Sequence, residues 1–392
     1  MVQNTSEYTK LQAAELNTEQ KACLATMLGA FVGDSLGSYT EFIRGDCSNE
    51  EVEQAMLMPG GGAWQLSPGQ ITDDSELAMC QLRGLLAGEG KFDHFHLALY
   101  YGYWIHYGPF DIGGTTANGL GPLKNCINNP DPRVAFEAAK RGPGPESLSN
   151  GSLMRITPLA VWARDLNLEE LKLCVKADVS FMHSNPAMWD ICTTYCLAIK
   201  VLLKNATSEN RAELALQAAK EIAHSYGFCQ EVAHWLSKAE ELAECASNMG
   251  ANSMNLFGSK IYDVSSQNMG FVEWAFVLAF YCLMRAKDLP IGELFDFSMR
   301  QCVKLQGDSD TNAAIVGGLI GAYVGLDNID TKKVKKVLEC RLRPQSRARS
   351  QRRPQFIQPG LSCVDEMIKL TQITPQRLEV ATEYNNKGLT IV

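Results

Sequence analysis

The 392-residue chain lacks several features that would assign a protein class at once. None of its 13 cysteines forms a Cys-x-x-Cys pair, and its first ten residues are polar, so we expect reduced thiols, no signal peptide and a cytoplasmic protein. A formal net charge of −8 disfavours a general nucleic-acid surface. The longest apolar run, Phe271 to Ala286, is short and contains Glu273, so we expect a buried core helix and no membrane segment.

Alternating apolar and polar residues, the pattern of half-buried strands, are also scarce. Apolar residues recur instead at helical spacing, which predicts an all-α fold. The composition, 46% hydrophobic and 20% charged, is ordinary for a globular protein. The length is compatible with two or three average domains and equally with one large enzyme domain.

Two turns rich in oxygen side chains stand out, and each precedes a predicted helix. They contain Asp308, Asp310 and Thr311 in the first case and Thr72, Asp73 and Asp74 in the second. Helix capping needs only one such side chain, although for the turn at 308–311 alone capping explains the pattern as well as cation binding does. Side chains in the first turn of a helix can converge on one point, which suits a hard divalent cation. Two such turns together favour a two-metal site.

Small residues recur at every fourth position in two predicted helices. They are Ala25, Gly29, Gly33 and Gly37 in the first helix and Gly317, Gly321 and Gly325 in the second. Glycine inside a helix costs about 1 kcal/mol relative to alanine, so a repeated glycine indicates a compensating contact. We therefore expect the two helices to approach closely in the centre of the fold.

Further polar residues are candidates for a binding site, although each has an ordinary structural interpretation. Asp34 lies on the first glycine-rich helix and Glu41 follows its end; a surface or capping role is the default for either. The segment 113–116, Gly-Gly-Thr-Thr, precedes a helix and can hold phosphate through backbone N–H groups, or form an ordinary turn. Gly151, in 150–153, permits close approach of a ligand. His183 lies in a helix break, where a structural hydrogen bond is the alternative to ligand contact.

Several of these stretches, taken in order, resemble the ADP-ribosylglycohydrolase family, the all-helical type that includes dinitrogenase reductase-activating glycohydrolase. They are Gly29-Ala-Phe-Val-Gly-Asp-Ser-Leu-Gly37 with Glu41, Thr72-Asp-Asp-Ser75, Asn150-Gly-Ser-Leu-Met-Arg155, His183 with Pro186, and Gly307-Asp-Ser-Asp-Thr-Asn-Ala-Ala314. Each motif is modest alone, but the ordered set is specific and spans about residues 20 to 370.

The resemblance implies a compact single-domain helical fold around a two-metal cleft. We therefore expect one domain over 18–371, a flexible N-terminus over 1–17 and a C-terminal tail over 372–392. Within the domain, 205–268 is expected to form a helical insertion or peripheral region. The segment 341–355 is expected to be an Arg-rich loop.

The resemblance also implies roles for individual residues. Two Mg²⁺ or Mn²⁺ ions would be held by Thr72, Asp73, Asp74 and Asp310 and by Asp308, Asp310 and Thr311, with Asp310 bridging. Glu41 would lie beside the metals, and Glu41 or Asp34 would act as acid or base. The cleft for the phosphates and riboses would be lined by Gly113, Gly114, Thr115, Thr116, Asn150, Gly151, Ser152, Leu153 and His183. Gly114 departs from the family pattern, in which asparagine is more usual.

The implied activity is metal-dependent hydrolysis of the C1″ glycosidic bond of ADP-ribose attached to a protein side chain or a related conjugate. The expected partner is therefore an ADP-ribosylated protein or small ADP-ribosyl conjugate. A catalytically silent structural or ADP-ribose-binding protein is the alternative, since the family fold has relatives such as a lens crystallin. A third interpretation is a two-metal phosphohydrolase that cleaves the pyrophosphate and releases AMP. No motif indicates whether the bond is to Arg, Ser, another ADP-ribose or an acyl group.

Overall fold

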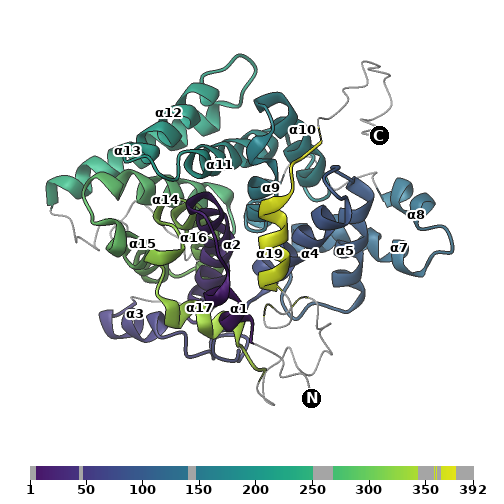
Figure 1. The fold of residues 1–392 in the computed structure, drawn as a ribbon, viewed down its shortest axis with the longest axis horizontal. Helices are drawn as coiled ribbons and strands as arrows, with labels where there is room; N and C mark the ends of the chain where they lie inside the picture. Colours follow the sequence, from purple (N-terminus) through teal and green to yellow (C-terminus); the bar gives the residue numbers. More distant parts are fainter. Residues whose placement is uncertain are drawn as a thin grey trace.

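The computed structural model describes residues 6–43, 47–139, 147–249, 268–342, 357, 359 and 363–376. Every regular element in these ranges is a helix, which confirms the predicted all-α class (Figure 1). The α-helices are α1 (Glu7–Ala13), α2 (Thr18–Gly37), α3 (Asn49–Met56), α4 (Asp73–Ala87), α5 (His94–His106), α6 (Gly114–Leu120), α7 (Lys124–Asn128), α8 (Pro132–Ala139), α9 (Thr157–Trp162), α10 (Leu168–Val179), α11 (Pro186–Lys204), α12 (Arg211–Ala223), α13 (Gln230–Met249), α14 (Val272–Met284), α15 (Ile291–Leu305), α16 (Ser309–Val324), α17 (Thr331–Leu338) and α19 (Cys363–Gln372).

Helices α2 and α16 form the centre of the molecule, where Figure 1 shows them side by side. A Cβ added at Gly33 would lie 2.0 Å from the carbonyl oxygen of Ala313, and one added at Gly29 would lie 2.4 Å from that of Gly317. The small-residue faces therefore bring the two backbones into direct contact, as predicted from the glycine spacing. Gly325 does not belong to this contact: it follows α16 with φ of +76°, and no atom lies within 4 Å of an added Cβ.

The N-terminus differs from the expectation of a flexible segment over 1–17, because residues 7–13 form α1. The Ser6 hydroxyl caps this helix by accepting from the Thr9 N–H at 3.2 Å. The helix then contacts α19: Lys10 Nζ lies 2.6 Å from an Asp365 oxygen, and the Val364 N–H donates to Glu7 Oε2 at 2.8 Å. Polar residues without helical periodicity gave no sign of this docking, which depends on a helix more than 350 residues away.

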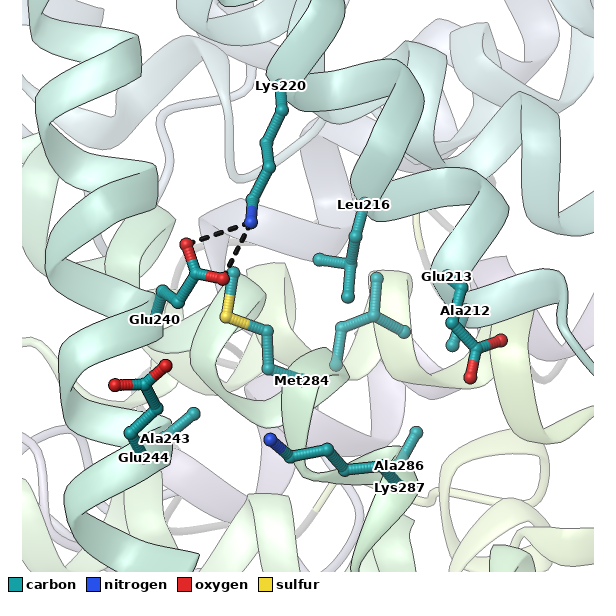
Figure 2. Close-up of a pocket in the computed structure, with 11 residues that line it drawn as sticks. Ala212, Glu213, Leu216, Lys220, Glu240, Ala243, Glu244, Met284, Ala286 and Lys287 are labelled. Atoms are coloured by element: carbon teal, nitrogen blue, oxygen red, sulfur yellow. Dashed lines mark hydrogen bonds and ion pairs between the residues drawn. The ribbon is translucent and has the colours of Figure 1, made fainter.

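The segment expected as a peripheral region, 205–268, contributes α12 and α13, which pack beside α14; residues 250–267 lie outside the described part. A pocket of about 200 Å³ opens between these helices (Figure 2). Lys220 Nζ is held there by both Glu240 oxygens, at 2.7 and 2.8 Å. Most of the predicted Arg-rich loop, 341–355, also lies outside the described residues.

Within the described part of the chain, α11 alone has the length and apolar composition to cross a membrane, with a mean hydropathy of 1.2. However, 61% of that stretch is buried inside the protein, where α11 packs against α9, α10, α12 and α16. A helix surrounded by other helices in this way is a core helix. Its apolar composition is therefore explained by the fold.

Candidate metal centre

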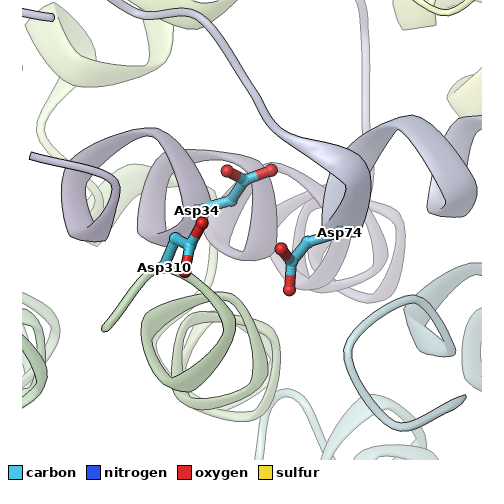
Figure 3. A group of neighbouring side chains, drawn as sticks. All are labelled: Asp34, Asp74 and Asp310. Carbon is cyan, nitrogen blue, oxygen red and sulfur yellow. The ribbon is translucent and has the colours of Figure 1, made fainter. Parts of the chain in front are cut away.

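The first carboxylate group forms where three helices meet. Asp34 comes from the last turns of α2, Asp74 from the first turn of α4 and Asp310 from the first turn of α16, and Figure 3 shows the three side chains gathered in one place. One carboxylate oxygen of each lies within 4.8 Å of the others. All three residues are buried. The close contact of α2 with α16 therefore brings together residues 34 and 310, which are far apart in the sequence.

Asp34 anchors the start of α4. Its oxygens accept from the Thr72 N–H at 3.0 and 3.1 Å and from the Ser75 N–H at 3.1 Å, so this carboxylate caps a helix other than its own. The Thr72 hydroxyl lies 2.8 Å from Asp34 Oδ1, 3.0 Å from Asp74 Oδ2 and 3.3 Å from Asp310 Oδ2. One hydroxyl thus lies at the centre of the three carboxylates.

Simple helix capping does not explain the acidic turns. Thr72 and Asp308 occupy the N-cap positions of α4 and α16, yet neither side chain accepts a capping hydrogen bond. Oxygen Oδ1 of Asp74 is buried and has no hydrogen-bond partner within the described residues. A buried carboxylate oxygen without a donor is what a metal-ligand position requires.

Ser309, between the two aspartates, has a structural contact instead. Its hydroxyl donates to the Gly37 carbonyl at 2.7 Å and lies 3.1 Å from the Thr40 hydroxyl. On the other side of the acidic turn, the Phe42 N–H donates to the Gly307 carbonyl at 2.9 Å. These bonds attach the turn after α2, which contains Glu41, to the first turn of α16.

A second carboxylate group contains Glu41, Asp111 and again Asp310, with one oxygen of each within 4.8 Å of the others. Glu41 Oε2 accepts a hydrogen bond from the Trp64 indole N–H at 2.8 Å. Asp111 is absent from our sequence-based candidates. It is a lone acidic residue in the loop between α5 and α6, without spacing or repetition to mark it.

The electrostatics of both groups are those of carboxylates buried without cationic partners. Burial, and then Asp111 and Asp308, raise the pKa of Glu41 to about 10. Burial, and then Asp308 and Asp34, raise the pKa of Asp111 to about 7, and burial raises that of Asp34 to about 6. No Lys or Arg forms an ion pair with these residues within the described ranges. Such a cluster needs protons or divalent cations, and its all-oxygen donors fit Mg²⁺ or Mn²⁺.

Two predicted ligands lie beside these groups rather than in them. Asp308 accepts a hydrogen bond from the Asn150 side-chain amide at 2.7 Å, and Asn150 N–H donates to the Gly270 carbonyl at 2.9 Å. Asp73, the first residue of α4, is buried, and its pKa is raised first by burial and then by Asp111. Asp73 and Asp308 therefore lie next to the two carboxylate groups, close enough to interact electrostatically with Glu41 or Asp111.

The two predicted loops lie close together. A Cβ added at Gly151 would lie 3.0 Å from the Thr116 hydroxyl, and the Thr115 hydroxyl lies 3.0 Å from that of Ser147. Gly113 and Gly114, at the start of α6, are exposed, and no heavy atom lies within 4 Å of a Cβ added at Gly114. The exposed N-terminal end of α6 thus lies beside the segment 150–153.

His183 makes the structural hydrogen bonds that the sequence left as an alternative. Its Nδ1 lies 2.7 Å from the Ser152 hydroxyl and its Nε2 lies 3.1 Å from that of Ser149. Burial and, second, the nearby Arg155 charge lower its pKa to about 4, so the ring is neutral near pH 7. His183 therefore holds the segment 149–152 rather than offering a free ring nitrogen.

A buried ion pair stabilises the segment that follows Asn150. Arg155 Nη1 lies 2.9 Å from an Asp178 oxygen, and both side chains are fully buried. Asp178 also accepts from the Tyr101 hydroxyl at 2.8 Å and from the Gln81 side-chain amide at 3.0 Å. The network joins α4, α5 and α10 to the loop that begins at Asn150.

The chain is similar to a known protein family and to several named proteins. It matches the ADP-ribosylglycohydrolase family over residues 15–356. An Acanthamoeba polyphaga mimivirus protein named as an ADP-ribosyl glycohydrolase is 30% identical over 323 residues, which cover 80% of this chain and 90% of that protein. The ADP-ribosyl-dinitrogen reductase glycohydrolase of Rhodospirillum rubrum is 24% identical over 315 residues, covering 80% and 89%.

A solved structure described as an ADP-ribosylglycohydrolase-related protein complex has the same fold, with a TM-score of 0.62 at 22% sequence identity. The match covers 92% of this chain and 100% of the other. The family match over most of the chain agrees with the ordered motifs around the two carboxylate groups. The chain therefore belongs to the ADP-ribosylglycohydrolase family of hydrolases.

Proposed function

We propose that this protein is a metal-dependent hydrolase that cleaves the C1″ glycosidic bond of ADP-ribose attached to a protein side chain or a related conjugate. The observation that carries the proposal is the pair of carboxylate groups that share Asp310. Family membership supports an ADP-ribosyl substrate, and the Rhodospirillum rubrum relative is named for a protein conjugate of this kind. The products are ADP-ribose and the released side chain.

We assign two Mg²⁺ or Mn²⁺ ions to this centre. Their ligands come from Thr72, Asp73, Asp74, Asp308, Asp310 and Thr311, to which we add Glu41 and Asp111 from the second carboxylate group. Bound divalent cations would orient the ribose 2″ and 3″ hydroxyls and a water molecule and would stabilise developing negative charge. The free Oδ1 of Asp74 and the absence of ion pairs within the described residues support this assignment.

Glu41 is the better candidate for the acid–base group, and Asp34 for a positioning group. Both oxygens of Asp34 accept hydrogen bonds from the start of α4, so its role is to hold Thr72 and Asp74 in place. Glu41 has one oxygen bound by Trp64, and Oε1 has no hydrogen bond to another described residue. Its raised pKa suits a carboxyl group that exchanges a proton with the leaving group or the attacking water.

The rest of the substrate would lie along the two adjacent loops. The first N–H groups of a helix have no partner within that helix, so the start of α6 at 113–116 can donate to a diphosphate. The segment 150–153, held by His183, would contact the riboses. The Asn150 amide is already bound to Asp308, so this loop also aligns the substrate with the acidic turn.

The test is release of ADP-ribose from mono-ADP-ribosylated Arg and Ser peptides, with Mg²⁺ and with EDTA, by the wild type and by Asp310→Ala. The matched control is Asp330→Ala, because Asp330 also lies at a helix start, capping the Lys332 N–H of α17, but belongs to neither carboxylate group. We expect Mg²⁺-dependent release by the wild type and the control and none by Asp310→Ala. Binding of ADP-ribose without release from either peptide would favour the silent alternative, and AMP as product would indicate a phosphohydrolase.

A further inference from the structure

The two carboxylate groups are held in different ways. Asp34, Asp74 and Asp310 lie on helices whose backbones fix their positions. Glu41 lies in the turn after α2, and Asp111 lies in a loop between α5 and α6, so no regular hydrogen-bond ladder positions either of them. The Phe42–Gly307 hydrogen bond attaches the backbone next to Glu41 to the start of α16, so the contact still needed is one that links Glu41 to the loop of Asp111.

Trp64 contacts both of these segments. Its indole N–H donates to Glu41 Oε2 at 2.8 Å. Its ring packs edge-on against Phe42, with centroids 6.3 Å apart, and against Phe110, with centroids 6.0 Å apart. Phe42 directly follows Glu41 in the chain and Phe110 directly precedes Asp111, so one indole ring joins the two segments that carry the loop carboxylates.

Backbone hydrogen bonds and glycines with positive φ define the conformation of the loop that carries Trp64. Gly61 and Leu66 exchange two backbone hydrogen bonds of 2.8 Å, which close the turn around Trp64. Gly60 and Gly62 have φ of +73° and +66°, where side chains are disfavoured, and a Cβ added at Gly62 would lie 2.3 Å from the Ser38 carbonyl oxygen. The loop is thus pressed against the turn that contains Glu41.

We infer that Trp64 is a positioning residue that holds Glu41 and Asp111 beside Asp310 and thereby sets the affinity of this carboxylate group for its cation. The inference rests on the proposed function. Residues that orient metal ligands through hydrogen bonds typically change metal affinity about 10- to 100-fold when they are mutated. Trp64→Phe removes the N–H donor but retains an aromatic ring, so it isolates the hydrogen bond from the ring packing.

A matched control exists in the same protein. Trp104 also donates its indole N–H to a glutamate, Glu76 Oε2, at the same distance of 2.8 Å, but Glu76 belongs to neither carboxylate group. Trp104→Phe therefore removes the same kind of bond from a glutamate that is in neither carboxylate group. A second test variant, Phe110→Leu, retains the Trp64 donor and removes one of its two ring contacts, so it tests the packing separately.

Isothermal titration with Mn²⁺ measures the number and affinity of bound cations in the wild type and in these variants, after thermal unfolding confirms that each is folded. We expect Trp64→Phe to bind one cation about 10- to 100-fold more weakly, Phe110→Leu to shift in the same direction, and Trp104→Phe to match the wild type. Unchanged affinities in Trp64→Phe, or an equal loss in Trp104→Phe, would overturn the inference alone. A wild type that binds no Mn²⁺ would overturn the proposed function and this inference together.

Discussion

Gly33→Ala tests the central helix contact and its link to the metal centre. A Cβ at this position would lie 2.0 Å from the Ala313 carbonyl oxygen, 2.5 Å from its carbon and 3.0 Å from Ala314 N. All three are backbone atoms within α16, so no change of side-chain rotamer removes the overlap. Ordinary contact begins at 3.4 Å, so the two helices must move apart by 1.4 Å at this point or bend around it.

The size of the effect follows from two opposing contributions. Added bulk in a packed core typically costs about 1–3 kcal/mol, and contact between two rigid helix backbones belongs at the upper end, about 3 kcal/mol. Alanine returns about 1 kcal/mol through its higher helix propensity. We therefore expect the free energy of unfolding to fall by about 2 kcal/mol. The control is Gly121→Ala, where φ is −48° and no atom lies within 4 Å of an added Cβ.

Urea unfolding in EDTA, followed by circular dichroism, measures the stability of both variants. Because Asp34 follows Gly33 directly, separation of the helices also moves Asp34 away from Asp310, so Gly33→Ala should bind Mn²⁺ more weakly. Gly121→Ala should match the wild type or be slightly more stable. If Gly33→Ala unfolds at the wild-type urea concentration, or if both variants lose the same stability, the close-packing argument is refuted.

Three further predictions concern charge. Without metal, Asp310→Asn should be more stable to urea than the wild type, because one buried carboxylate is removed; with Mg²⁺ it should gain no stability and show no hydrolysis. In EDTA, the free energy of unfolding of the wild type should fall as the pH rises from about 4 to 7. The folded pKa values of Asp34 and Asp111, about 6 and 7, lie above the ordinary 3.8, so the folded state binds more protons than the unfolded state over this range. A flat urea midpoint from pH 5 to pH 8 would contradict this. Asp178→Asn should lower the free energy of unfolding by about 3–5 kcal/mol, since Arg155 stays buried without its counter-charge; thermal unfolding at pH 7 measures it.

Local patterns in the sequence were sufficient to predict the all-helical class. Helix α10, Leu168–Val179, illustrates this, because its apolar residues follow helical spacing after an Asn167–Glu170 capping box. The central contact was also predictable, since glycine at every fourth position of a helix leaves one face bare enough for another backbone to approach. Asp310, on which both carboxylate groups depend, was found because it belongs to a run of oxygen side chains.

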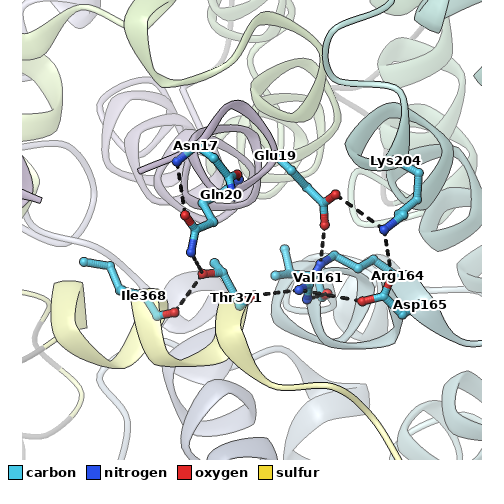
Figure 4. A network of polar contacts seen from close by, with 9 residues as sticks. All are labelled: Asn17, Glu19, Gln20, Val161, Arg164, Asp165, Lys204, Ile368 and Thr371. Carbon is cyan, nitrogen blue, oxygen red and sulfur yellow. Dashed lines mark hydrogen bonds and ion pairs between the residues drawn. The ribbon is translucent and has the colours of Figure 1, made fainter. Parts of the chain in front are cut away.

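Contacts between distant residues account for what the sequence did not reveal. In the polar network of Figure 4, Arg164 donates to Glu19, 145 residues away, and to the Thr371 carbonyl, 207 residues away. These bonds tie α19 to the core, yet each residue alone looks like an ordinary surface group. Asp111 was missed for the same reason: only the fold brings this single loop carboxylate beside Glu41.

The metal centre and the fold are therefore linked through the same helix contact. Asp34 lies on α2 and Asp310 on α16, so the carboxylates meet only where the two glycine-bearing faces touch. In the absence of cations, burial of these charges and then their mutual repulsion oppose this contact; burial first, and neighbouring carboxylates second, also raise the pKa values of Glu41 and Asp111. Cations that bind only the folded arrangement would stabilise it by mass action. Changes that loosen the contact between α2 and α16 should thus weaken cation binding, even where they lie far from any ligand.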